Sequence, residues 1–409
     1  MAETRQELST ALYYNDSAQR VIARLQKERD EARDALSRVS VTAAPNGTGQ
    51  ANGDAMQVDG QGLPQDVLGK IDATQAKLSA TRRKRPVPED WATGDEIAAY
   101  DVKSKADTQF TGAKSLAVDE TGDFFLTGDS DGTVGIYDLK QDAFTTRSNL
   151  SAGGINHGAW ARDSAVVATA SGAVVVTQEG AVKAKFQQHA GAATAVAAHP
   201  SGELLASVGV DKSLVLYDLQ HGKVLTQIFS DAGKFIHWRC RGRRKTVTDI
   251  FTALTSTTFH PDGHLLAAGA ADGSIELYDV KTCQLAHTFP SPAGATPVAD
   301  LNFSENGTWL ASAYEGSTTV TVWDLRKLSA LKTLEVGGAV TGISWDYTGQ
   351  FLAACGPGGV TVAQYTKASK SWTEPLRKGV SGAQDVKWGA NAKKLVTLTS
   401  DGAVNVLAA

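Results

Sequence analysis

Cysteine is scarce in this 409-residue sequence, and its three cysteines, Cys240, Cys283 and Cys355, lie far apart. Such isolated cysteines form neither a disulfide framework nor a zinc site of the usual spacing, which favours a reducing compartment. No apolar run approaches the roughly 20 residues of a membrane-spanning helix, and the polar N-terminus does not resemble a secretory signal. We therefore expect a soluble, intracellular protein with no membrane partner.

An excess of charge of one sign is also missing. The chain has 40 basic and 44 acidic residues, a formal net charge of −4, and neither half is strongly basic. A broad electrostatic contact with nucleic acid therefore has no compositional support, and we expect no direct nucleic-acid partner. The 40 glycines, against only 11 prolines, instead indicate many tight turns.

A repeated unit follows the first hundred residues. Each copy has an apolar strand, a glycine turn, a second apolar strand, an aspartate turn and a strand that ends in an aromatic residue and aspartate. Four copies are clear and three are degraded, which makes seven. The turn glycines recur after 44 residues from Gly263 to Gly307 and after 42 from Gly307 to Gly349. A period of roughly 40–45 residues is typical of four-stranded propeller blades. The sequence thus predicts an all-β, seven-bladed WD-repeat propeller over residues 94–409.

Aspartate occupies the turn between the second and third strands in four units, at Asp131, Asp211, Asp272 and Asp401. A carboxylate there can accept hydrogen bonds and close the turn. His189 and Ser207 stand with Asp211 where WD-repeat blades typically form a buried His–Ser–Asp network. A catalytic triad is the alternative interpretation, but these positions recur in degraded form in other units, which favours a structural role. We expect no catalytic residue, no cofactor and no metal site.

The last unit stops directly after its third strand, so we expect its outer strand to come from another part of the chain. A propeller left open would expose sheet edges, which invite aggregation. Residues 96–102, just before the first unit, alternate between apolar and polar side chains. We predict that this segment supplies the missing strand and joins the two ends of the propeller.

One connection is too long for the repeat. Gly202 and Gly263 are 61 residues apart, about 20 more than one unit, and the excess falls in residues 233–252. This insertion contains one tryptophan and a group of cations: Trp238, Arg239, Arg241, Arg243, Arg244 and Lys245. It is consistent with a retained intron, because its Gly-Lys start can be encoded by a splice-donor sequence and its removal restores the period. A surface insertion, which costs little free energy, and a loop that contacts nucleic acid stay open as alternatives.

Residues 1–39 carry a heptad pattern. Its apolar side chains follow alternating steps of three and four, with polar interruptions at Asn15 and Arg29, along the seam Leu8, Ala11, Ala18, Ile22, Leu25, Ala32, Leu36 and Val39. Charges of both signs flank the seam, as on the solvated face of a coiled coil. The pattern predicts a helix that associates with copies of itself. Packing of this helix against the propeller is the alternative.

Two short segments separate the heptads from the repeats. Residues 40–62 are mostly Gly, Ala, Asn, Thr and Gln, a composition typical of a flexible linker. Pro64 then opens a short helix expected over residues 63–85, with an apolar face of Val67, Leu68, Ile71 and Leu78. Its basic end, Arg82, Arg83, Lys84 and Arg85, fits a nuclear-import signal or a merely solvated surface.

The helical runs at residues 4–13, 20–25 and 27–33 closely resemble the coiled-coil region of the pre-mRNA-processing factor nineteen family. The basic segment and the seven repeats extend the resemblance over nearly the whole chain, although propellers alone serve many functions. Members of this family are ubiquitin ligases and scaffolds of the nineteen complex, which acts in splicing and in DNA-damage responses. The resemblance implies a nuclear homotetramer, assembled through the coiled coil, whose propeller recruits spliceosomal, nineteen-complex and substrate proteins.

Two other classes of function compete with this interpretation. The first is a coiled-coil and WD-repeat adaptor, for example of the cytoskeleton, with no role in ubiquitin transfer. The second is a propeller hydrolase, which is disfavoured because no nucleophile–base pair or paired carboxylates stand outside the repeat positions. The sequence indicates neither the face of the propeller that binds partners nor the identity of the substrates.

In the family a U-box precedes the coiled coil, whereas here the heptads begin near residue 4. No position of the chain matches a U-box residue, and the U-box is the part that docks the charged ubiquitin-conjugating enzyme. We therefore expect no ligase activity from residues 1–409 alone. An autoubiquitination assay with the recombinant chain should give no more ubiquitin chains than a reaction without conjugating enzyme, and robust chain formation would refute this expectation.

Overall fold

The computed structural model describes residues 63–83, 90–230 and 252–409, except positions 109, 111, 120, 142, 151 and 293–295. The heptad seam from Leu8 to Val39, the linker over residues 40–62 and all but the last residue of the insertion lie outside the described residues. The predictions made for those segments stay predictions.

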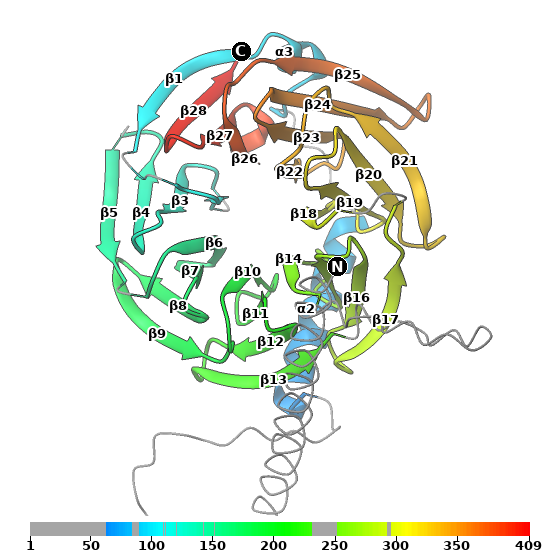
Figure 1. The fold of residues 1–409 in the computed structure, drawn as a ribbon. Helices are drawn as coiled ribbons and strands as arrows, with labels where there is room; N and C mark the ends of the chain where they lie inside the picture. The colour runs from blue at the N-terminus through cyan, green and yellow to red at the C-terminus, as the bar shows by residue number, and fades with distance from the viewer. Residues whose placement is uncertain are drawn as a thin grey trace, which may run out of the picture. The chain divides into compact units, whose positions relative to one another are not determined.

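The described strands form seven four-stranded antiparallel sheets. Figure 1 shows the sheets arranged as blades around a central axis, and this confirms the predicted seven-bladed propeller. We number the blades 1–7 in chain order and list the strands of each from the innermost outward. Blades 1 to 3 contain β2 (Leu116–Val118), β3 (Phe124–Gly128), β4 (Thr133–Asp138) and β5 (Ala143–Asn149); β6 (Ile155–Ala161), β7 (Ser164–Thr169), β8 (Ala173–Gln178) and β9 (Ala181–Gln187); and β10 (Ala193–Ala198), β11 (Leu204–Gly209), β12 (Ser213–Asp218) and β13 (Lys223–Phe229).

The remaining blades repeat this order, except that blade 7 ends on a strand from the beginning of the described chain. Blades 4 to 7 contain β14 (Leu254–Phe259), β15 (Leu265–Ala270), β16 (Ile275–Asp279) and β17 (Gln284–Phe289); β18 (Val298–Phe303), β19 (Trp309–Tyr314), β20 (Thr319–Asp324) and β21 (Ser329–Glu335); β22 (Gly342–Trp345), β23 (Phe351–Gly356), β24 (Gly359–Thr366) and β25 (Ser371–Lys378); and β26 (Ala383–Trp388), β27 (Leu395–Thr399), β28 (Ala403–Ala408) and β1 (Asp101–Asp107).

The hydrophobic core lies between blades rather than at one centre. Seven apolar clusters are present in the described part of the chain, and each takes its residues mainly from two neighbouring blades. The middle strands β11 and β12 are buried at every position, whereas the outer strand β5 alternates between exposed and half-buried side chains. A strand with neighbours on both faces has no solvated side, so its sequence is mostly apolar and its few polar side chains are buried.

Bulges on the innermost strands direct side chains across the blade junctions. The pairing shifts register near the start of five of these strands, β6, β10, β14, β18 and β26. In β10 the extra residue is Thr194, between Ala193 and Ala195. A bulge re-aims the side chain at its site, and here the Thr194 hydroxyl donates to the Leu254 carbonyl of blade 4 at 2.7 Å.

A comparable hydrogen bond crosses every junction and completes a ring. A side chain on or beside an innermost strand bonds to the backbone of an adjacent blade in the pairs Ser115–Gly158, Asn156–Ala193, Thr194–Leu254, Thr255–Val298, Asp300–Ile343, Thr341–Ala383 and Asp385–Leu116. Each such bond adds only about 1 kcal/mol of net stability. The ring therefore acts mainly by fixing the spacing and tilt of neighbouring blades.

The strand that closes blade 7 does come from the segment before blade 1, but its predicted position was wrong. Residues Gly94–Ala98 form the helix α3, and β1 (Asp101–Asp107) pairs antiparallel with β28. The helix begins at a capping box, in which the Thr93 side chain accepts the Glu96 amide and the Glu96 carboxylate accepts the Thr93 amide. Ile97 and Tyr100 are both buried, and their spacing of three residues is typical of a helix. The apparent alternation over residues 96–102 concealed this spacing.

A second helix, α2 (Gln65–Arg83), packs against the propeller at blades 3 and 4. Its buried side chains Val67 and Ile71, together with Leu63 just before it, join the apolar cluster that contains Leu216 and Tyr278. Polar contacts add to this packing, because Lys70 lies 3.4 Å from Glu203 and Asp72 forms an ion pair with Lys281 of blade 4.

The pairing of β1 with β28 predicts a difference between two truncated chains. Residues 90–409 keep the closing strand, whereas residues 108–409 lose it and expose the edge of β28. We expect the shorter chain to melt roughly 5–10 °C below the longer one, because several ladder hydrogen bonds are lost. Calorimetry of both chains measures the difference.

The longer chain is the matched control, because both chains lack α2 and differ only in the segment that includes α3 and β1. Equal melting temperatures for the two chains would show that β1 does not stabilise the closed ring.

Candidate functional site

The residues that resemble a catalytic triad lie inside blade 3. Nδ1 of His189 is 3.0 Å from the Asp211 carboxylate, Nε2 is 2.7 Å from the Ser207 hydroxyl, and that hydroxyl is 2.9 Å from the Tyr217 hydroxyl. These distances confirm the predicted buried network. The side chains of His189 and Ser207 are closed off from solvent, so no substrate reaches the hydroxyl. These hydrogen bonds instead connect the segment before β10 with the turn between β11 and β12 and with both of those strands.

The carboxylate of Asp211 anchors this network. Burial alone raises its pKa, but hydrogen bonds from His189, the Ala190 amide and Ser213 outweigh it and lower the pKa to about 2. Asp272 and Asp401 accept hydrogen bonds within their own turns in the same manner. Blade 1 differs, because Asp129 accepts the amides of Asp131 and Thr133 at 2.9 and 2.8 Å. In blade 1 the carboxylate that closes the turn is therefore that of Asp129 and not that of Asp131, which the sequence pattern did not reveal.

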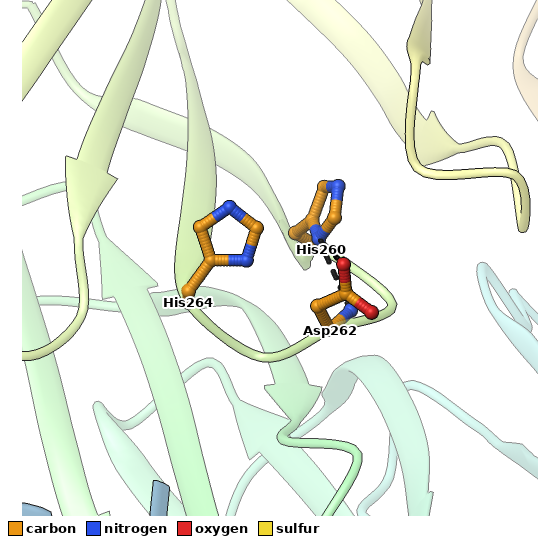
Figure 2. A group of neighbouring side chains, drawn as sticks. All are labelled: His260, Asp262 and His264. Atoms are coloured by element: carbon orange, nitrogen blue, oxygen red, sulfur yellow. Dashed lines mark hydrogen bonds and ion pairs between the residues drawn. The ribbon is translucent and has the colours of Figure 1, made fainter. Parts of the chain in front are cut away.

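A group that could hold a metal ion occupies the turn between β14 and β15. Figure 2 shows His260, Asp262 and His264, whose ligand atoms all lie within 4.8 Å of one another. The spacing His-x-Asp-x-His could have revealed the group from the sequence, where we expected no metal site.

The hydrogen bonds of His260 favour a structural role for this turn. Its Nδ1 accepts the Asp262 amide at 3.0 Å and its Nε2 donates to the Gly307 carbonyl of blade 5 at 3.0 Å. His199 makes the same two bonds one blade earlier, to the Ser201 amide and the Gly263 carbonyl, with a serine in place of the aspartate. A ligand role would require His260 to give up a bond that the repeat uses to connect blades. We therefore assign no metal to it.

A hollow with aromatic walls lies between blades 5 and 6, beside the outer strands β21 and β25. We call it the interblade groove and define it by Trp309, Tyr365 and Trp372, with Leu331 at its edge. It has a volume of about 850 Å³. The ring centroids of Trp309 and Tyr365 are 4.7 Å apart and perpendicular, and those of Tyr365 and Trp372 are 5.2 Å apart. Fixed, partly exposed aromatic rings are typical of peptide-binding surfaces.

The charges around the interblade groove are mixed. Asp324, Glu335 and Glu374 stand beside Lys332 and Lys370, and Glu374 is paired with Arg377 at 2.7 Å. No single sign dominates this lining. The groove therefore suits an uncharged segment rich in proline or aliphatic side chains rather than a strongly charged one.

Other residues predicted as sites are only partly described. Arg82 and Arg83 fall in the last turn of α2, while Lys84 and Arg85 lie outside the described residues. The apolar face of α2 could be predicted from the sequence, but the blades against which this face packs could not. Within the described part of the chain, no helix has both the length and the hydropathy to cross a membrane.

Family models match three parts of the chain. Residues 1–39 match the model described as Prp19/Pso4-like. Residues 108–138 and 180–218 match the WD domain, G-beta repeat, and residues 250–306 match the WD40 domain of anaphase-promoting complex subunit 4. The fold, the buried histidine network and these matches define a WD-repeat propeller protein.

Individual relatives cover nearly the entire chain. Pre-mRNA-processing factor 19 of Caenorhabditis elegans is 32% identical over 417 residues, which span 98% of this chain and 79% of the relative. Pre-mRNA-processing factor 19 homolog 2 of Arabidopsis thaliana is 29% identical over 97% of this chain and 77% of its own length. The Schizosaccharomyces pombe factor is 27% identical, with coverages of 99% and 80%. The chain belongs to the pre-mRNA-processing factor 19 family.

The burial of His199 predicts how stability depends on pH. Burial lowers the pKa of His199 to about 4, below its ordinary value of 6.5. Its proton therefore binds more weakly in the folded state, so stability is full above pH 6.5 and falls as the pH drops toward 4. The loss is on the order of 3 kcal/mol for such a shift. We expect His199→Gln to flatten this part of the curve of unfolding free energy against pH.

Denaturant unfolding at several pH values between 4 and 7 measures that slope. His287→Gln, on the outer strand β17, serves as the control, because His287 makes no side-chain bond across a described blade junction. An identical slope for wild type and His199→Gln would contradict the prediction, whatever the absolute loss of stability.

Proposed function

We propose that this chain is a nuclear scaffold of pre-mRNA splicing, whose coiled coil assembles several copies and whose propeller recruits partner proteins. Its relatives are named as pre-mRNA-processing factors, and they align with the heptads as well as with the propeller. The alignment over both parts is the observation that carries the proposal, because a propeller alone would fit many functions. Membership of a nineteen complex and a role in DNA-damage responses are part of the same proposal.

The interblade groove supports the recruiting role. Its aromatic side chains are partly exposed although they are large, and they are held in place by ring contacts with one another. We propose that it binds an extended, uncharged segment of a splicing partner. The serine of the His189 network is buried and closed off from substrate, so that network does not favour an enzymatic function over this one.

The heptad seam supports the assembly role. A seam of about five heptads buries its apolar side chains only when a second helix covers them. We propose a homotetramer through Leu8 to Val39. Several propellers in one assembly would turn weak contacts at each groove into firm attachment, because the second contact is made at high effective concentration. The basic residues from Arg82 to Arg85 support import into the nucleus.

Depletion of the protein from its own cells, followed by expression of variants, tests the proposal. We expect depletion to raise the ratio of unspliced to spliced transcripts and the wild-type chain to restore it. Trp372→Ala should restore it poorly, because truncation of an aromatic anchor typically weakens binding by tenfold or more. Ile22→Asp with Leu25→Asp should also fail and should reduce the mass in light scattering from four copies to one.

Val182→Ala, at an exposed position of β9, provides the control for surface substitutions. If depletion leaves splicing unchanged, the splicing function is rejected. If depletion impairs splicing but Trp372→Ala restores it fully, the function stands and the interblade groove is not the recruiting surface. A wild-type chain that is monomeric in light scattering would reject the assembly role.

A further inference from the structure

The aromatic side chains of the interblade groove have polar atoms that the fold does not use. Trp309 begins β19 of blade 5, whereas Tyr365 and Trp372 are paired across β24 and β25 of blade 6. Within the described part of the chain these side chains make ring contacts but no hydrogen bonds, and their indole nitrogens and hydroxyl are accessible to solvent. These polar atoms are therefore available to a ligand.

Two tryptophans of other blades show the contrast. The Trp160 indole nitrogen donates to the Ala117 carbonyl at 3.1 Å, and the Trp323 indole nitrogen donates to the Ser312 hydroxyl at 2.9 Å. In both cases the N–H group helps to hold the propeller together, as is usual for a buried indole. The two indoles of the groove contribute only their rings to the fold.

The rings of the groove are fixed before a ligand arrives. Trp345, which is only 6% exposed, lies beside them with its ring centroid 6.0 Å from that of Trp309 and 6.0 Å from that of Trp372. These contacts, together with those among the groove rings themselves, restrain the side-chain rotamers. A ligand therefore binds to the rings without a large cost of ordering.

The charges beside the groove nearly cancel. Its lining has three acidic and two basic side chains, and one of the acids, Glu374, is paired with Arg377. A charged ligand of either sign thus gains little here. The two indole groups, in contrast, can only donate hydrogen bonds. Their complement is a segment that carries no charge and has free backbone carbonyls.

Free carbonyls distinguish one backbone conformation from the others. A helix bonds its carbonyls internally and an added strand bonds them to a sheet edge, whereas a polyproline II segment has no internal hydrogen bonds and leaves them exposed. Proline also fixes its own φ angle, which lowers the entropy lost on binding. Aromatic-lined grooves are the usual surface on which such segments dock.

We propose that the interblade groove binds a proline-rich segment in the polyproline II conformation. Its proline rings pack on Trp309, Tyr365 and Trp372, and its backbone carbonyls accept the two indole N–H groups. This inference rests on the recruiting role proposed for the groove, and it names the chemistry of the segment that is recruited.

Saturation-transfer NMR on the full chain tests the proposal with two uncharged hexapeptides. One is acetyl-hexaproline amide, which adopts polyproline II in water. The other alternates serine with leucine, so that it has apolar side chains without that conformation. We expect hexaproline to bind about tenfold more tightly, because its backbone is already ordered. Its affinity should be the same at low and high salt, because it carries no charge.

Trp309→Phe and Trp372→Phe each remove an indole N–H but keep an aromatic ring. Either substitution should weaken hexaproline binding by about fivefold, the equivalent of one neutral hydrogen bond. Trp160→Phe is the matched control, because it makes the same change at an indole that bonds within the propeller. It should leave the affinity for hexaproline unchanged.

Equal binding of the two peptides would overturn the proposal. Hexaproline binding that survives in both groove variants, or that falls equally in Trp160→Phe, would also overturn it. Binding that appears only after Ile22→Asp with Leu25→Asp has separated the copies would identify a second copy as the occupant, which is a further contradiction. The titration contains no splicing substrate. A negative result therefore leaves the splicing function standing, and a positive one stands even if depletion leaves splicing unchanged.

Discussion

The propeller depends on the hydrogen bonds that join each innermost strand to its neighbour. No blade can bury both of its faces alone, so the fold is only as stable as its seven junctions. At each junction a side chain reaches a backbone group of the next blade, and an apolar cluster lies outside that bond. The bond at Asp385 and Leu116 joins blade 7 to blade 1 and so completes the ring. One strand pair, β1 with β28, then closes the outer edge of blade 7.

The number of blades and the network around His189 could be predicted, because both follow from a repeat that is visible in one sequence. The junction bonds could not, since Thr194 and Thr255 are bulge residues whose direction depends on strand register. The closing strand was placed too early because residues 96–98, which belong to the helix α3, were read as part of an alternating strand. The interblade groove was missed for a different reason. Trp309 and Trp372 are distant in sequence and meet only after the blades have packed.

The position of the interblade groove follows from the construction of a propeller. The groove lies beside the outer strands β21 and β25 of two neighbouring blades, and large aromatic side chains fill it partly. Innermost strands converge, and the turns after them bring residues of four blades into one small area at the channel mouth. Within this convergent region Lys387 lies 2.8 Å from the Asp385 carboxylate, so the two opposite charges are paired.

The origin of β1 also has a consequence for biosynthesis. β1 is made before any other described strand of the propeller, whereas its partner β28 is the last of the described strands. A ribosome therefore completes six blades while the strand that closes the seventh waits without a partner. Contacts between such distant segments form late and slowly, so the nascent domain has an exposed edge until β28 has been made. A chain that stops short of β28 cannot close its ring, and its unpaired edges are the kind of surface that chaperones and proteases act on.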